Sequence, residues 1–283
     1  MNNNIYEIVE MPNGLKMMSV LPINNTGIAE AYCTIRENFI GKSNGECGPF
    51  SCNIYKQYGL ENGIKDFQLC CEALGILPSQ VITNRLTALT NKVRVVNEET
   101  LIDYDIYDEP NAPRADGLVT NSSKVTLFHY AADCAICFLV DPVKKVCGCL
   151  HASWKGTLLG IFEAEIRAFQ TTYGSKVEDI IAVLMPSIGV ESFEVGIECA
   201  EKFVQAGYAD YVDNTSYQKP HINLPKVNHK ILLNCGLSVG NVYVIDDLCT
   251  YQNEKMFHSF RRGPIDENGM HLNGMNGYFI KLK

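Results

Sequence analysis

The sequence has 283 residues and a formal net charge of −8, with 46% hydrophobic and 20% charged residues. This balance is typical of a soluble globular protein and excludes a disordered or fibrous chain. The negative charge, with no basic run longer than Arg261-Arg262, argues against nucleic acid and an anionic membrane as partners, since both require clustered cations.

The N-terminal segment indicates a cytoplasmic protein, and this location predicts the state of the cysteines. The first residues carry neither the charged region nor the apolar run of a signal peptide, and no later apolar run is long enough to cross a membrane. In the cytoplasm the twelve cysteines stay reduced. We therefore expect free thiols rather than a disulfide framework.

Helix and strand patterns are mixed along the chain, which has no repeat or linker, so we expect a single domain over residues 1–283. In chain order the patterns predict a polar loop at 41–49, a helix at about 64–75, strands at 92–96, 125–130, 134–140 and 146–151, a helix at 157–173, a strand at 180–184, helices at 196–206 and 226–235, and strands at 242–246 and 278–282. Several strands are joined by turns too short for parallel crossovers. The sequence therefore predicts an α+β fold with mixed, largely antiparallel sheets and helices packed outside.

The stretch 132–156, ADCAICFLVDPVKKVCGCLHASWKG, is typical of two strands joined by a turn. Asp-Pro opens turns well, because proline presets the backbone angle of the second turn position. A loop from Asp141 to Lys144 places Cys134 directly opposite His151, with side chains that start about 5 Å apart. A thiol and an imidazole at that distance could share a metal ion or a proton.

The four cysteines of this stretch also raise the hypothesis of a closed zinc site formed by sulfur alone. Cys134 and Cys137, however, lie within an apolar strand, where their odd spacing sends the two side chains to opposite faces. We therefore favour packing for Cys137, Cys147 and Cys149, which behave as small hydrophobic residues, and a functional role for Cys134.

Polar residues at the ends of the two strands predict a cleft. Asp133 stands at the mouth of an apolar strand, either as a site carboxylate or as a turn cap. His151 leads into a helix start, whose free N–H groups favour an anion such as phosphate beside the imidazole. The alternative for His151 is a structural histidine bonded to a backbone carbonyl. We interpret Trp154 as a packing anchor.

Seven short motifs follow one another along the chain: CTIREN, GPFSCNI, ADGLVTN, ADC, HASWKG, MPSIGVESFEVG and FHSFRRG. In this order they resemble the motifs of the YfiH family, also called the laccase-domain or multicopper polyphenol oxidoreductase family. The resemblance implies an α/β/β/α layered fold, related to a toxin deamidase fold with a Cys-His pair. It also implies phosphorolysis of purine nucleosides with phosphate and deamination of adenosine, beside an older label of polyphenol oxidase, or laccase.

The resemblance further implies a pocket that binds zinc, described earlier as copper, through one cysteine and two histidines. Carried over residue by residue, it assigns Cys134 and His151 as two of these ligands. It assigns Arg36 as a contact of phosphate or substrate, with Lys155 and Arg261 as further anion contacts. Lys155 stands where the family has an arginine, so two-pronged recognition of an anion is weakened there.

The remaining family ligand, a histidine in a Q-x-H segment, has no counterpart in this chain. The matching region reads VITNRLTALTNKVRVV and contains no histidine. The first histidine of the chain is His129, and the candidate substitutes for the missing ligand are His258 and His129. The zinc site is therefore incomplete as the family builds it.

Three hypotheses of function follow. The first is a purine nucleoside phosphorylase or adenosine deaminase, zinc-dependent if its site is complete, with Cys134, His151, Asp133 and Arg36 as catalytic residues. The second is a divergent member without bound metal that serves as a nucleoside-binding or interaction protein. The third is a metal-independent thiol catalyst, in which His151 activates Cys134 as the nucleophile.

Overall fold

Two six-stranded sheets form the centre of the structure, a computed structural model that describes residues 4–38, 50–54, 60–108, 111–267, 269, 271 and 273–283. The first sheet has the order β1 (Tyr6–Glu10), β2 (Lys16–Val20), β3 (Ala29–Thr34), β14 (Asn276–Leu282), β7 (Thr126–Ala131) and β4 (Val81–Ile82). The second has the order β13 (Val242–Val244), β10 (Ile181–Leu184), β8 (Ala135–Asp141), β9 (Val146–Ala152), β6 (Gly117–Thr120) and β5 (Val93–Val95). A short ribbon pairs β11 (Val212–Asp213) with β12 (His221–Ile222).

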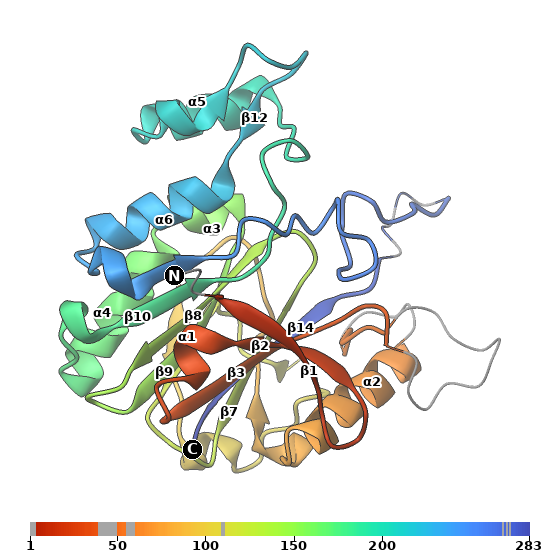
Figure 1. The fold of residues 1–283 in the computed structure, drawn as a ribbon, viewed down its shortest axis with the longest axis vertical. Coiled ribbons are helices and arrows are strands. Elements are labelled where there is room, and N and C mark those ends of the chain that lie inside the picture. Colours follow the sequence, from red (N-terminus) through yellow and green to blue (C-terminus); the bar gives the residue numbers. More distant parts are fainter. Residues whose placement is uncertain are drawn as a thin grey trace.

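Helices cover the outer faces of the two sheets (Figure 1). They are α2 (Leu60–Ala73), α3 (Trp154–Leu158), α4 (Ile161–Tyr173), α5 (Ile197–Gln205) and α6 (Leu224–Asn234). The short helix α1 (Leu21–Asn24) instead buries Ile23 in the core between the sheets. Short 3₁₀ turns occur at η1 (Pro78–Gln80), η2 (Glu98–Leu101), η4 (Val177–Asp179), η5 (Ala209–Tyr211) and η6 (Val239–Asn241). In the described part of the chain no helix combines the length and apolarity needed to cross a bilayer.

The strand β14 shows how alternating side chains build the layers. Tyr278, Ile280 and Leu282 face the core between the two sheets, whereas Phe279 points to the opposite side. There its ring stacks on Phe67 of α2, with ring centroids 5.9 Å apart. A third apolar layer joins the second sheet to α4 and α6. The order helix, sheet, sheet, helix confirms the α/β/β/α architecture that the family resemblance implied.

The predicted strands correspond to β5, β7, β8, β9, β10, β13 and β14, and three of the predicted helices correspond to α2, α5 and α6. The N-terminal strands β1, β2 and β3, together with β4, β6, β11 and β12, were not predicted. The single helix predicted at 157–173 is wrong, because α3 ends at Leu158 and α4 begins at Ile161. Gly160 between them has φ 83°, a left-handed conformation that interrupts a helix. The predicted loop at 41–49 lies outside the described residues.

The β8–β9 hairpin has a register that differs from the predicted one by two residues. Asp141 is the last residue of β8 and pairs with Val146, so the turn follows Asp141 instead of beginning with it. Its Oδ1 atom accepts hydrogen bonds from the backbone N–H groups of the two residues after Pro142, at 2.8 and 2.9 Å. His151 therefore lies opposite Ile136 and not opposite Cys134. A shift of two residues keeps every side chain on its face, so Cys134 and His151 remain on the same side.

The other three cysteines of the hairpin pack as predicted. Cys137, Cys147 and Cys149 have no exposed surface. Cys137 faces the helical layer, whereas the other two lie in the core between the sheets. Burial raises the pKa of each of these thiols. The hypothesis of a four-sulfur zinc site fails, because the sulfur atoms point to different faces.

Glu165 of α4 is an acidic side chain with no exposed surface. Two glycines of the second sheet leave room for its carboxyl group: a Cβ atom at Gly117 would lie 2.2 Å from Oε2, and one at Gly148 would lie 2.7 Å from Oε1. Burial raises the pKa of Glu165 well above its usual range, and neither carboxyl oxygen has a hydrogen-bond partner among the described residues. The folded protein therefore keeps this proton at pH values where the unfolded chain has lost it.

Replacing Glu165 with glutamine keeps the shape of the side chain and removes its titration. Above about pH 4.3 the unfolded chain ionises at this position and the folded protein does not, so the wild type loses stability as pH rises, by up to about 1.4 kcal/mol per pH unit. We expect the free energy of unfolding of Glu165→Gln, measured with urea, to exceed that of the wild type by a margin that widens from about pH 5 to about pH 8. The exposed Glu163 lies on the same helix, and Glu163→Gln is the control that should leave the pH dependence unchanged. Parallel pH profiles for the wild type and Glu165→Gln would contradict this account.

Candidate functional site

A cavity of about 610 Å³ opens at the ends of β7 and β9 and the start of β8. Aromatic side chains form much of its wall; they are Tyr130, Trp154, Phe193 and Phe260. Arg85 and Arg261 also border the cavity, and Cys134 and His151 lie side by side in its lining. Its volume falls in the range of small-molecule sites, roughly 300–1,000 Å³.

Cys134 and His151 meet as the hairpin predicted, although by a different register. Cys134 directly precedes β8 and is partly exposed, whereas His151 lies near the end of β9 and is buried. The thiol lies in the same cavity lining as the imidazole and is close enough to raise the pKa of the ring. The Nδ1 atom of the ring lies 2.9 Å from Oδ1 of Asp116. Three residues from three strand ends thus stand in one line, in the order carboxylate, imidazole and thiol.

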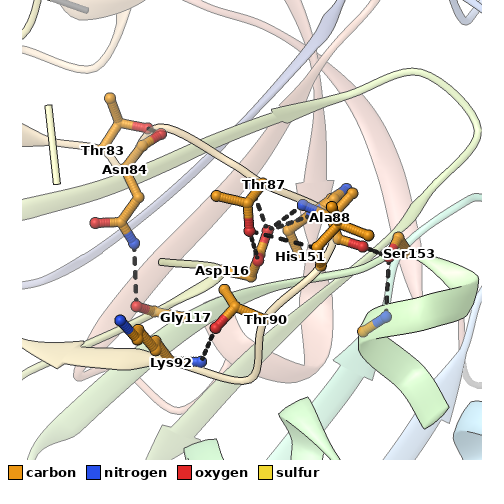
Figure 2. Close-up of polar contacts among 12 residues, drawn as sticks. Thr83, Asn84, Thr87, Ala88, Thr90, Lys92, Asp116, Gly117, His151 and Ser153 are labelled. Carbon is orange, nitrogen blue, oxygen red and sulfur yellow. Dashed lines mark hydrogen bonds and ion pairs between the residues drawn. The ribbon is translucent and has the colours of Figure 1, made fainter. Parts of the chain in front are cut away.

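Asp116, which precedes β6, is the buried end of this line (Figure 2). Its Oδ1 atom also accepts hydrogen bonds from the backbone N–H groups of Thr87 and Ala88, at 3.3 and 3.2 Å, and its Oδ2 atom accepts one from the Thr87 hydroxyl at 2.9 Å. The backbone N–H of His151 donates to the Asp116 carbonyl at 2.7 Å. Asp116 therefore holds both the ring and the backbone of His151, and binds the loop between β4 and β5 to them.

The charges of the three groups support one another. Burial by itself lowers the pKa of His151, but the neighbouring Cys134 and the hydrogen bond with Asp116 outweigh it and raise the pKa to about 10. Burial raises the pKa of Asp116, yet the hydrogen bond and the charge of His151 prevail and lower it below its usual value. The site therefore stabilises a carboxylate beside an imidazolium.

Asp133, predicted as a catalytic carboxylate, is engaged in holding loops together. Its Oδ1 atom accepts a hydrogen bond from the Thr250 hydroxyl at 2.7 Å, and its Oδ2 atom accepts bonds from the Ser259 hydroxyl at 2.9 Å and the Arg261 N–H at 2.8 Å. The residue also has φ 82°, a left-handed conformation that is costly for a side chain with a Cβ atom. These contacts make Asp133 an anchor of the loops next to Cys134, and the catalytic role predicted for it stays a prediction.

The predicted anion contacts are separated in the structure, and only Arg261 borders the cavity. Arg36 lies in another surface hollow, where its Nη1 atom donates to the carbonyl of Glu254 at 2.7 Å and lies 3.6 Å from Oε1 of the same residue. Lys155 is exposed, with Nζ 5.2 Å from the ring centre of Trp154. The structure does not bring Arg36 and Lys155 to Cys134 and His151.

Sequence reasoning missed Arg85 and the importance of Asp116. Arg85 belongs to the segment between β4 and β5, the same region that was searched for the missing histidine. Asp116 lies in the quoted ADGLVTN motif, which could have marked it as a site residue. Trp154 packs near Phe203, with ring centroids 6.5 Å apart, as the packing interpretation expected. It also lines the cavity, which that interpretation did not include.

The side chains around Cys134 do not fit a zinc or copper ion bound by three protein ligands. The segment expected to supply the third ligand presents Arg85 and Leu86 to the cavity, a cation and an apolar group. The candidate substitute His258 is buried outside the cavity lining, with Nε2 2.8 Å from the carbonyl oxygen of Phe50. The other, His129, lies in β7 with no exposed surface and is not part of the cavity lining. Across the described ranges, no three His, Cys, Asp or Glu side chains are grouped to hold a metal.

A family model described as multi-copper polyphenol oxidoreductase laccase matches residues 32–277. The chain belongs to this family. The match covers all three residues of the line formed by Asp116, His151 and Cys134, and it confirms the resemblance found in the motifs. Two solved structures share the fold: YfiH of Bacillus licheniformis, with a TM-score of 0.83 at 24% identity over 99% of this chain and 100% of that one, and YlmD of Geobacillus stearothermophilus, with a TM-score of 0.83 at 20% identity over 99% of each.

Several proteins similar to this chain are named as enzymes that act on purine nucleosides. A purine nucleoside phosphorylase of Bacteroides thetaiotaomicron is 25% identical over 95% of this chain and 98% of its own length. The mouse purine nucleoside phosphorylase LACC1 is 38% identical over 52% of this chain and 35% of its own length. The chain thus spans about a third of the mouse relative, and likewise of the human one, of which it covers 36%. An adenosine deaminase named RL5, from an unknown prokaryotic organism, is 29% identical over 66% of this chain and 69% of its own length.

The role of Asp133 as an anchor can be tested by its effect on stability. Asp133→Ala removes the acceptor of three hydrogen bonds and keeps a Cβ atom at a left-handed φ, so we expect a loss of about 3 kcal/mol in the free energy of unfolding. Asp133→Asn retains one acceptor oxygen and tolerates this backbone conformation, so its loss should be smaller, about 1 kcal/mol. Urea denaturation measures both. Equal, near-zero losses would show that the loops do not depend on this carboxylate.

Proposed function

We propose that the chain is a purine nucleoside phosphorylase of its family, which binds a purine nucleoside and phosphate in the cavity and also deaminates adenosine. The observation that carries the proposal is one cavity that combines aromatic walls, two arginines and the Cys134–His151 pair. A nucleoside phosphorylase needs these three kinds of group: a surface for the base, cations for phosphate and a polar group at the reacting atoms. The names of the relatives support the same substrate class.

The aromatic side chains provide the surface for the base. Tyr130, Trp154, Phe193 and Phe260 come from four separate segments and border one space. A purine that stacks on an aromatic ring gains about 1–3 kcal/mol per base. Because aromatic faces accept any purine, this wall favours purine nucleosides as a class without selecting one of them.

The two arginines provide the cations for phosphate. Guanidinium groups bind phosphate through paired N–H donors, and they remain charged at all physiological pH values. Arg261 is oriented by two hydrogen bonds, one from its backbone N–H to Asp133 and one from Nη2 to the carbonyl of Glu194 at 2.9 Å. Its other guanidinium donors are available to an anion.

In phosphorolysis, phosphate attacks the sugar carbon that carries the base, and the departing base must receive a proton. His151 is the proton-bearing group that the structure sets beside the cavity, held by Asp116 through Nδ1. We assign it as the proton donor to the base. We assign no step to zinc or copper, because the side chains around Cys134 do not complete a three-ligand site.

The activity is tested by incubating the protein with adenosine, inosine or guanosine and phosphate, followed by chromatography of the products. Free adenine, hypoxanthine or guanine that forms only with phosphate demonstrates phosphorolysis, and inosine that forms from adenosine demonstrates deamination. Binding of adenosine measured by calorimetry without either product would identify a nucleoside-binding protein instead. The absence of both adenosine binding and product formation would refute the proposal.

The aromatic wall is tested by Phe260→Ala. Phe260 is 44% exposed, so its removal should spare the fold, yet it borders the cavity. Loss of one stacking surface should weaken adenosine binding about tenfold, measured by calorimetry. Tyr251→Ala is the matched control, since Tyr251 is 39% exposed and does not line the cavity. A similar effect of both variants would exclude a specific contact between Phe260 and the base.

The phosphate contact is tested by comparing Arg261→Gln with Arg36→Gln. Hydrogen bonds to charged groups contribute about 1.5–3 kcal/mol, so Arg261→Gln should raise the KM for phosphate about 10- to 100-fold. Arg36→Gln should leave this KM unchanged, because Arg36 lies in a different hollow and contacts Glu254. Steady-state kinetics at varied phosphate and saturating nucleoside distinguish the two arginines. A larger rise in the KM for phosphate in Arg36→Gln than in Arg261→Gln would support Arg36 as the phosphate contact, as the family resemblance implied.

A further inference from the structure

We propose that Cys134, His151 and Asp116 form a metal-independent nucleophilic triad, in which Cys134 bonds covalently to a carbon that carries an amino group, as C6 of adenosine does. The choice of adenosine rests on the proposed function. The triad itself rests on the geometry of the three residues and on the groups that surround them.

The first support is the order of the three groups. A carboxylate, an imidazole and a thiol follow one another: the carboxylate lies 2.9 Å from Nδ1 of the ring, and Cys134 is the diagonal neighbour of His151 on the same face of the hairpin. This is the arrangement of nucleophile, base and orienting group that covalent catalysis requires. The orienting group is buried, while the thiol reaches the cavity surface. Cys134 can therefore meet a ligand without leaving His151.

The second support is the backbone before the nucleophile. Asp133 adopts its left-handed conformation directly before Cys134, and its three accepted side-chain hydrogen bonds hold it there. Its carbonyl also accepts a hydrogen bond from the N–H of Ile188 at 3.0 Å. A strained backbone persists only where its surroundings hold it, and such positions cluster at active sites. The strain here fixes the direction in which the Cys134 side chain leaves the chain.

The third support is the part of the cavity lining that the segment between β4 and β5 supplies. That segment presents Arg85 and Leu86, a cation and an apolar group. A guanidinium group repels a divalent cation and offers it no ligand. This part of the lining therefore favours a cysteine that works without a metal ion.

The reaction balances without an added oxidant or reductant. The Cys134 thiolate attacks C6 of adenosine and forms a carbon–sulfur bond, and the electron pair of the ring C=N bond moves to nitrogen. His151 gives a proton to the amino group, which leaves as ammonia while the C=N bond is restored. Water then adds to C6 and gives a proton to His151, and the carbon–sulfur bond breaks. The thiolate is regenerated, and the product is inosine.

Alkylation of the full chain by iodoacetamide tests the nucleophile without nucleoside turnover. After treatment with EDTA, Cys134 should react about 30 times faster at pH ~7 than the half-buried cysteines of the same chain, because the triad places its thiol at the cavity surface beside a base. The half-buried Cys199 and Cys235 are internal controls, quantified by peptide mass spectrometry in the same sample. Labelling of Cys134 no faster than that of Cys199 and Cys235 would overturn the triad, and this outcome needs no variant that might fail to fold.

The 6-chloro analogue of purine riboside tests the bond to C6. Displacement of chloride by the Cys134 thiolate leaves a stable thioether, seen as the added mass of the purine riboside on the peptide that contains Cys134. Cys134→Ala should give no adduct and no inosine. Inosine formation that persists in Cys134→Ala, or that requires one bound zinc per chain, would overturn the proposal.

Asp116 acts through His151, so it is a positioning residue and needs a separate readout. Asp116→Asn should lower kcat for deamination about 100-fold, while the KM for adenosine stays within about twofold, because the side chain lies behind the ring of His151. Labelling of Cys134 should slow in the same variant, whereas labelling of Cys199 should not. A change in KM alone, or an equal change at both thiols, would mean a structural role only. Rapid labelling of Cys134 in a protein that neither binds nor converts nucleosides would refute the proposed function and leave the triad standing.

Discussion

The hydrogen bond between Asp116 and His151 is the contact on which the rest of the site depends. It lies where β6 begins and β9 ends, and the same carboxylate holds the loop between β4 and β5 through Thr87 and Ala88. That loop carries Arg85 and Leu86 into the cavity. One buried carboxylate thus orients the imidazole and holds the loop that contributes Arg85 and Leu86 to the cavity. A buried carboxylate is stable only with such partners, and here each of them has a place in the site.

Asp133 is the counterpart of Asp116 on the other side of the cavity. Its carboxylate gathers Thr250, Ser259 and the backbone of Arg261, so the loops that follow β13 are bound to the start of β8. Both acidic residues therefore assemble the site from segments that are distant in sequence. Cys134 lies between the two assemblies, next to Asp133 in the chain and beside His151 in space. The arrangement of loops around Asp116 and Asp133 does not depend on the missing family metal ligand, because hydrogen bonds to these two carboxylates hold it together.

The sequence patterns predicted mixed sheets with helices outside and the approach of Cys134 to His151, because both depend on local periodicity. The four-layer order was implied by the family resemblance. The exact pairing depended on whether Asp141 belongs to the turn or to the strand, and the left-handed conformation of Lys145 after it left no mark in the sequence. Asp116 and its partner His151 are 35 positions apart, and no periodic pattern connects residues at that separation. The partner of Arg36 lies 218 positions further along the chain, so its direction could not be inferred from neighbouring residues.

The place of β14 in the first sheet has a consequence for the order of assembly. This strand lies between β3 and β7 and bonds to both, so these two strands have no direct pairing in the sheet order. The side chain of Asn276, at its start, donates to the carbonyl of Ala131 at the rim of the cavity and to the carbonyl of His258. During synthesis the first sheet can be completed only after residues 276–282 have left the ribosome, because β14 joins β3 to β7. The strands β8 and β9 of the second sheet can pair earlier, so we expect a stage of folding in which this hairpin is formed and the rim of the cavity at Ala131 is still open.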